Sequence, residues 1–164
     1  MKYSLLHSTA LAALILALAL LAAPLPAAAQ TTAAAPETSV ASVALQDINL
    51  KELVPKTRMP DGQRAIFEPK SVRFTAQLAQ MPTPQKADYL YKVMGMMGIN
   101  NPPAVSRHIV LEYGGDKALM AYVEDQAAAR FAKEAKTGEQ YVFYAIYVYN
   151  NRYGPALVVT SFSK

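Results

Sequence analysis

The chain contains no cysteine, and this absence excludes several classes of protein. Disulfide bonds cannot stabilise the fold, and a CxxC redox site is impossible. Attachment of a lipid to a processed N-terminal cysteine is excluded as well. The hydrophobic core must therefore be held together by noncovalent burial alone.

Outside its N-terminal segment, the chain has no long hydrophobic run. Residues 1–29 have the pattern of a secretory signal peptide, with a charged Lys2, an apolar stretch from Leu11 to Leu21, and Ala27 and Ala29 at a small-residue cleavage site. The apolar stretch is shorter than the roughly 20 residues of a membrane-spanning helix. We therefore expect a soluble, exported protein that is periplasmic, with an extracellular location as the alternative.

Histidine is scarce, and only His108 lies beyond the expected signal peptide. The sequence has neither a G-x-S-x-G motif nor an H-E-x-x-H motif, and its acidic residues do not follow the spacing of a calcium loop. One histidine without cysteine cannot form a typical zinc site. We expect a non-enzymatic protein without a cofactor, and a hydrolase that uses His108 is the alternative.

Charge is moderate and spread along the chain, with 16 basic and 12 acidic residues and a formal net charge of +4. Nucleic-acid binding usually requires a concentrated basic face, so no nucleic-acid partner is expected. Arg130, Lys133 and Lys136 recur at every third residue of a predicted helix. A solvated helix face is the first interpretation of this pattern, and peripheral contact with an anionic surface is the alternative.

Composition divides the remaining chain into three parts. Residues 30–42 are rich in Ala, Thr and Ser without an aromatic residue, which predicts a disordered tether. Residues 43–69 carry prolines among scattered apolar residues, which predicts an irregular segment packed on the domain. Residues 70–164 have clear periodicity and are expected to form a single globular domain.

The periodicity within the domain predicts elements in the order β-α-β-β-α-β-β, which indicates an α+β fold with a small antiparallel sheet and two helices. Thr83 and Asp125 are expected to cap the two helices. The strands are expected at residues 71–78, 107–113, 118–124, 140–150 and 156–163, and the helices at 84–97 and 126–137.

One part of this pattern resembles a known family. Residues 118–162 contain a strand, a short helix that ends in Lys136-Thr137-Gly138-Glu139, a long strand and a returning strand. This stretch resembles the second half of an OB-fold barrel, as in small exported bacterial OB-like proteins. The resemblance implies a partly open barrel with a binding function rather than an enzyme. A ferredoxin-like βαββαβ arrangement with one added strand is the alternative.

Tyrosine is unusually frequent, and four of the ten tyrosines lie between residues 141 and 149. Strand alternation places Val142, Tyr144, Ile146 and Val148 on one face, which is expected to be aliphatic core. The opposite face carries Tyr141, Phe143, Ala145, Tyr147 and Tyr149. This aromatic face is either covered by another element or exposed to a ligand.

The binding hypothesis places the contact surface at the end of this strand and in the turn that follows. Its residues are Tyr147, Tyr149, Arg152 and Tyr153. Aromatic rings can stack on a sugar or on the apolar surface of another protein while their hydroxyl groups make hydrogen bonds. The expected partner is therefore an envelope protein or a glycan.

Methionine suggests a different function. Met94, Met96 and Met97 bring together thioether groups, which are ligands that Cu(I) prefers. Met94 and Met97 also share the apolar helix face of Leu90 and Val93, where methionine commonly fills gaps in a core. Core packing is the first interpretation of these residues, and copper handling is the alternative.

Overall fold

The computed structural model describes residues 44–164. The predicted signal peptide and the predicted tether lie outside the described residues. The described part is an α+β fold with six strands and three helices. These elements are β1 (Gln46–Asp47), α1 (Leu50–Thr57), β2 (Ala65–Pro84), α2 (Asp88–Met96), β3 (Val105–Glu112), β4 (Ala118–Glu124), α3 (Asp125–Glu134), β5 (Gln140–Asn151) and β6 (Gly154–Ser163).

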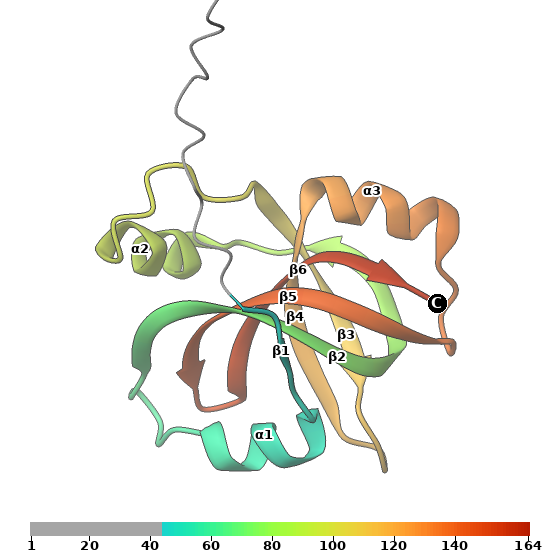
Figure 1. The fold of residues 1–164 in the computed structure, drawn as a ribbon, viewed down its shortest axis with the longest axis horizontal. Helices are drawn as coiled ribbons and strands as arrows, with labels where there is room; N and C mark the ends of the chain where they lie inside the picture. The colour runs from blue at the N-terminus through green and yellow to red at the C-terminus, as the bar shows by residue number, and fades with distance from the viewer. Residues whose placement is uncertain (1–43) are drawn as a thin grey trace, which may run out of the picture. The chain divides into compact units, whose positions relative to one another are not determined.

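The six strands form one mixed sheet in the order β1-β2-β3-β4-β6-β5, and β2 also pairs with β5 (Figure 1). The expected antiparallel sheet is therefore only partly correct, because β1 pairs with β2 in parallel and β4 pairs with β6 in parallel. The β2–β5 pairing curls the sheet back on itself into a partial ring. The β4–β6 contact is short, with only Tyr122 paired to Val158 and Val123 paired to Val159.

The length and irregularity of β2 allow this curvature. The strand has 20 residues, pairs with β5 from Ala65 to Gln77 and with β3 from Gln77 to Pro84, and has register shifts in both ladders. Such bulges bend a strand and increase its twist. Strand β2 can therefore pair with β3 along one part of its length and with β5 along the other, which closes the ring.

The inside of the ring holds the larger hydrophobic core. Val72, Phe74 and Leu78 of β2 point into it with the period-2 alternation expected from the sequence. Helix α3 adds Phe131, which stacks on Phe162 of β6 with ring centroids 4.1 Å apart. Helix α1 adds Leu50 and Val54, so two helices pack against this core.

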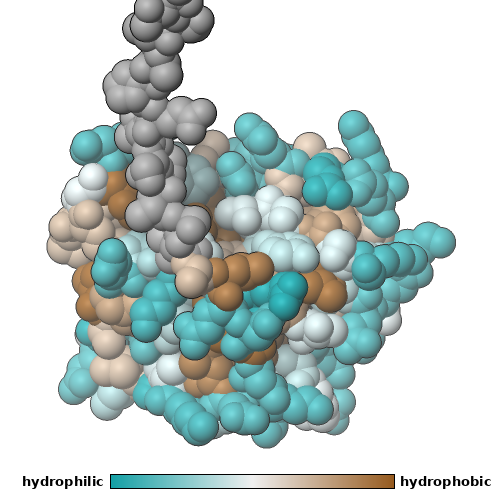
Figure 2. All heavy atoms as spheres, in the orientation of Figure 1, coloured by the Kyte–Doolittle hydropathy of each residue, from teal (hydrophilic) through white to brown (hydrophobic). Residues whose placement is uncertain are grey.

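A second hydrophobic cluster contains the buried residues of α2. Leu90, Val93 and Met94 of α2 pack with Val148 of β5 and Val158 of β6. Helix α2 therefore covers strand residues that are not part of the first core. On the face of the molecule in Figure 2, apolar areas are separated by hydrophilic side chains.

The expected helix count was wrong, because the segment predicted to be irregular contains α1. Asn49 caps this helix by accepting a hydrogen bond from the backbone nitrogen of Lys51 at 3.0 Å. Leu50 and Val54 are buried on one side of it, and Pro55 is tolerated inside the last turn. The prolines in this segment led to the prediction of an irregular chain, although it forms a short amphipathic helix.

Both predicted N-caps are also wrong. Thr83 lies within β2, where it pairs with His108 of β3, and α2 begins only after Ala87. Asp125 is the first residue of α3 instead of its cap. Its carboxylate accepts hydrogen bonds from the backbone nitrogen of Ser106 at 3.0 Å and from the hydroxyl of Ser106 at 2.7 Å, which ties α3 to β3.

Candidate functional site

A bulge in β5 separates two of the predicted site residues. Tyr147 pairs with Leu157 of β6 and Tyr149 pairs with Ala156, so Val148 is an extra residue without a partner in β6. An extra residue shifts the alternation of side chains by one position. Tyr147 therefore belongs to the core inside the ring and Tyr149 belongs to the second cluster under α2.

The aromatic face up to the bulge forms part of the core, so the interpretation that another element covers it is confirmed. Tyr141, Phe143 and Ala145 are buried, and Tyr147 is only 8% exposed. The opposite face was expected to be aliphatic core, but Val142, Tyr144 and Ile146 are only half-buried. The expectation of an aliphatic core is thus met in part, because Val148 of that face is buried in the second cluster and Ile146 packs against it.

Tyr147 is enclosed by neighbouring side chains. Its ring packs edge-on against Phe67 at a centroid distance of 4.7 Å, and its hydroxyl donates to the side-chain oxygen of Asn150. Burial raises the pKa of the Tyr147 hydroxyl. Tyr147 is therefore a core residue and is not available to contact a ligand in this structure.

Tyr149 lies at the wall of a surface cleft although its side chain is only 3% exposed. Its ring packs edge-on against Tyr89 of α2 at a centroid distance of 5.2 Å. Burial raises its pKa, and the neighbouring Tyr122 adds to this effect. The tyrosines of α2, β4 and β5 thus form one contiguous group.

We call this hollow the tyrosine cleft. It has a volume of about 370 Å³ and contains three of the four predicted site residues. Segments that are far apart in the sequence meet here, since the lining comes from the chain before β2, from α2, from β4, from the end of β5 and from the β5–β6 turn. The lining residues are Gly62, Gln63, Arg64, Tyr89, Met120, Tyr122, Tyr149, Asn151, Arg152 and Tyr153.

Two arginines of the tyrosine cleft lie against aromatic rings. The guanidinium carbon of Arg64 is 4.1 Å from the centroid of the Tyr89 ring, and that of Arg152 is 4.5 Å from the centroid of the Tyr153 ring. Each is a cation–π contact that restricts the arginine side chain, and Arg152 also donates a hydrogen bond from Nη2 to the Tyr153 hydroxyl. The guanidinium of Arg152 also lies 3.5 Å from a carboxylate oxygen of Asp61.

A second hollow continues from the tyrosine cleft, and we call it the adjoining pocket. It has a volume of about 440 Å³ and shares Met120, Arg152 and Tyr153 with the cleft. Met120 is 50% exposed and Tyr153 is 57% exposed, so apolar side chains face solvent at the junction. The other lining residues of the adjoining pocket are Arg58, Val110, Ala118 and Leu119.

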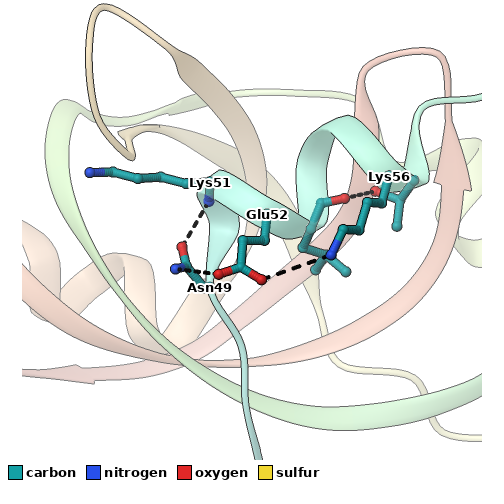
Figure 3. Close-up of polar contacts among 6 residues, drawn as sticks. Asn49, Lys51, Glu52 and Lys56 are labelled. Atoms are coloured by element: carbon teal, nitrogen blue, oxygen red, sulfur yellow. Dashed lines mark hydrogen bonds and ion pairs between the residues drawn. The ribbon is translucent and has the colours of Figure 1, made fainter.

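Another hollow lies at the start of α1 and is lined mainly by polar residues. Figure 3 shows Asn49 bound to the backbone of Lys51 and to Glu52, whose carboxylate also pairs with Lys56. The Lys51 side chain extends toward the β3–β4 turn, where a Cβ added to Gly114 would overlap it. These contacts are explained by helix capping and turn packing, so this hollow is a weaker candidate site.

His108 has a hydroxyl group as its neighbour. The Oγ1 of Thr83 lies 3.4 Å from Nδ1 and 3.3 Å from Nε2 of the ring, which is long for a hydrogen bond. Within residues 44–164, His108 forms no ion pair with a carboxylate at 4.0 Å or less. The acid that the hydrolase alternative requires is therefore not beside the ring in this arrangement.

The methionines are distributed between the core and the surface. Met94 is buried in the second cluster, Met97 packs against that cluster, and Met96 is 58% exposed. Met81 packs against the first core instead. These positions fit the core-packing interpretation of Met94 and Met97.

The predicted basic face of α3 carries charges of both signs. Arg130 pairs with Glu134 at 2.8 Å, and its guanidinium carbon lies 5.1 Å from the centroid of the Phe162 ring. The Arg130 guanidinium holds the pKa of Glu134 below its usual range. Lys133 is exposed on α3 and Lys136 is exposed just beyond the end of the helix, so the Arg130–Glu134 pair is what reduces the positive charge of this face.

Between residues 44 and 164, no group of three or more histidine, aspartate and glutamate side chains is arranged to hold a metal ion. None of the helices described here is long and apolar enough to cross a membrane.

Four residues that the sequence analysis missed line the tyrosine cleft, namely Arg64, Tyr89, Met120 and Tyr122. They come from three separate segments, namely the chain before β2, α2 and β4, and the closure of the ring brings these segments together. A scan against models of protein families gives no match to this chain. A search of curated proteins gives no match either.

Proposed function

We propose that this protein is an exported, non-enzymatic binding module that holds an anionic partner in the tyrosine cleft. The observation that carries the proposal is the pair of arginines, Arg64 and Arg152, each lying against a tyrosine ring in one hollow. A guanidinium held against a ring can still direct its remaining N–H groups at a carboxylate or phosphate. The stacking reduces the side-chain freedom that binding would otherwise remove.

The surrounding charges support an anionic ligand. The residues that line the tyrosine cleft and the adjoining pocket include three arginines, Arg58, Arg64 and Arg152, and no carboxylate. The one acid paired with them, Asp61, has a side chain that is 82% exposed. An exposed ion pair of this kind contributes little free energy, so a ligand carboxylate can replace Asp61 at small cost.

The strand order supports an OB-like barrel as the framework of this module. The ring runs β2-β3-β4-β6-β5 and returns to β2, with α3 between the third and fourth ring strands in sequence. The strands joined through α2 are antiparallel neighbours, whereas a ferredoxin-like fold connects parallel strands at that point. OB-folds bind their ligands on the face of the second and third strands and on the flanking loops. The tyrosine cleft has the corresponding position, since it involves β4, α2 and the β5–β6 turn.

Export is part of the proposal because residues 1–29 have the pattern of a signal peptide. The proposed location is the periplasm, where anionic groups of envelope proteins and glycans are available as partners. The absence of cysteine is compatible with an oxidising compartment, since no thiol can form an unwanted disulfide.

The test measures binding of the full chain to three fluorescent anionic probes by anisotropy. The probes are a short acidic peptide, an oligomer of galacturonic acid, and vesicles that contain phosphatidylglycerol. The double variant Arg64→Ala/Arg152→Ala should weaken binding of at least one probe by about tenfold or more, because charge-assisted hydrogen bonds contribute roughly 1.5–3 kcal/mol each.

Arg107→Ala combined with Lys133→Ala is the matched control, since it removes the same charge from exposed positions outside the cleft. This control should bind within about twofold of the unmodified chain, as expected for exposed charges remote from a ligand. Equal losses in the two double variants would indicate attraction by net charge alone and would contradict the proposed site. Absence of binding by all three probes would also contradict the proposed site.

A further inference from the structure

We propose that the partner is an extended acidic segment of another protein, which adds to the free edge of β4 as an extra strand. This inference rests on the proposed function, because the added segment would place its carboxylates on the arginines of the tyrosine cleft and the adjoining pocket. It specifies the class of ligand and the backbone contacts that bind it.

The free edge lies in the first half of β4. Residues Ala118–Ala121 are paired with β3 on one side, from Glu112 to Ile109. On the other side, the parallel pairing with β6 includes only Tyr122 and Val123. Ala118–Ala121 therefore have no ladder partner on the β6 side within the described chain. An edge with unpaired backbone groups is a template for strand addition.

The adjoining pocket runs along this free edge. Ala118, Leu119 and Met120 line it from β4, while Arg152 and Tyr153 line it from the β5–β6 turn. Four residues of an added strand would extend about 13 Å, at roughly 3.3 Å per residue. The pocket volume of about 440 Å³ is sufficient for only a few residues, which corresponds to the length of the unpaired edge.

The walls of the pocket specify the chemistry of the added segment. Arg58 and Arg152 offer guanidinium groups, and Val110 and Met120 offer apolar contact. Side chains alternate between the two faces of a strand. A segment in which acidic and apolar residues alternate could therefore place carboxylates toward the arginines and aliphatic groups toward β3 and β4.

A glycan fits this site less well, because few ring faces are free for stacking. Arg64 lies over one face of the Tyr89 ring and Arg152 lies over one face of the Tyr153 ring, so Tyr153, at 57% exposure, has only its other face free. Tyr149 is almost completely buried. The exposed features that remain are guanidinium edges, an aliphatic surface and a strand edge, which together favour a peptide.

The experiment uses the full chain and a short capped peptide of alternating valine and glutamate, labelled with fluorescein. Anisotropy should show binding that falls by about tenfold or more in Arg58→Glu, because one guanidinium contact is lost and replaced by repulsion. Backbone hydrogen exchange, followed by NMR, should slow at Ala118–Ala121 when the peptide is added. A peptide of alternating valine and lysine is the charge control and should not bind.

A second control separates strand addition from simple charge attraction. N-methylation of alternate residues of the acidic peptide removes the amide donors along one edge and keeps every charge. Methylation on the edge that faces β4 should abolish binding, and methylation on the opposite edge should not. Equal binding by both methylated peptides, or binding without slower exchange at Ala118–Ala121, would overturn the inference.

The outcomes also distinguish this inference from the proposed function. If the galacturonic acid oligomer binds through Arg64 and Arg152 while the acidic peptide does not, the proposed function stands and the strand-addition inference is wrong. If a second copy of the chain already covers the edge, sedimentation will show a dimer and exchange at Ala118–Ala121 will be slow without peptide. That result also overturns the inference.

Discussion

The guanidinium of Arg64 lies over the ring of Tyr89, with 4.1 Å between the guanidinium carbon and the ring centroid. This contact connects the segment before β2 with α2, two parts of the chain that share no strand pairing. Arg64 forms no ion pair with any residue between 44 and 164. The ring of Tyr89 is therefore the main support that holds Arg64 in the tyrosine cleft.

Replacing Tyr89 by leucine should weaken the binding of an anionic probe by about two- to fivefold, since a cation–π contact at an exposed site contributes roughly 0.5–1 kcal/mol. Tyr89→Phe keeps the ring and should bind as the unmodified chain does. Anisotropy titrations of both variants provide the measurement, and urea unfolding checks that the second cluster remains folded. Equal weakening in both variants would assign the effect to the hydroxyl group and not to the ring face.

Asp61 is an internal competitor for the same site, because its carboxylate lies 3.5 Å from the guanidinium of Arg152. Asp61→Asn should therefore strengthen binding of the anionic probe by about two- to threefold, consistent with the small energy of an exposed ion pair. Raising the salt concentration should reduce the difference in probe affinity between this variant and the unmodified chain. Unchanged or weaker binding would mean that Asp61 positions Arg152 instead of competing with the ligand.

The sequence predicted best those elements whose signals are local. The β3–β4 hairpin was expected because Gly114, Gly115 and Asp116 separate two strand patterns, and all three adopt the positive φ values that such a turn requires. The alternation of β2 and the apolar face of α3 were visible for the same reason. In each case the decisive residues are neighbours in the chain.

The errors arose where a single residue or a distant contact decides the structure. Alternation placed Tyr147 and Tyr149 on one face, but the extra residue Val148 turns them to different clusters. Nothing in the local sequence marks Val148 as a bulge. The tyrosine cleft could not be predicted because Arg64 and Tyr89 meet Tyr149 only through the closure of the ring.

The buried tyrosines predict a loss of stability in alkaline solution. Burial raises the pKa of Tyr149 and of Tyr147 in the folded state above the usual value of about 10. The folded protein then holds these protons more tightly than the unfolded chain does. Their contribution to stability is complete below about pH 10, the pKa in the unfolded chain, and is lost as the pH rises toward the folded-state values.

Urea unfolding between pH 8 and pH 11 measures this effect. Tyr149→Phe removes one of the ionising groups and should give a flatter decline of the unfolding free energy with pH. Tyr147→Phe should act in the same direction. The comparison must be made as a slope against pH, because each substitution also removes hydroxyl contacts and changes the stability at pH 8. A slope identical to that of the unmodified chain would contradict the proposed burial of the hydroxyl.

Gly154, at the start of β6, should be sensitive to any side chain. Its φ is +111°, and an added Cβ would lie 3.0 Å from Cγ1 of Val54 and 3.5 Å from the backbone oxygen of Val54. Gly154→Ala should therefore lower the unfolding free energy by roughly 1–3 kcal/mol, through backbone strain and a clash with α1. Because Gly154 follows Arg152 and Tyr153, this substitution should also disturb the turn and weaken binding in the tyrosine cleft.

Two comparison variants separate the causes of that effect. Gly95→Ala lies in α2, where an added Cβ meets no atom within 4 Å, and it should raise the unfolding free energy by about 0.5–1 kcal/mol. The double variant Val54→Ala/Gly154→Ala removes the clash but keeps the strained φ. Its loss of unfolding free energy should therefore be smaller than the sum of the losses in the two single variants. If the losses of unfolding free energy are additive, the contact between α1 and β6 does not contribute. Backbone strain at the positive φ would then be the sole reason for glycine at residue 154.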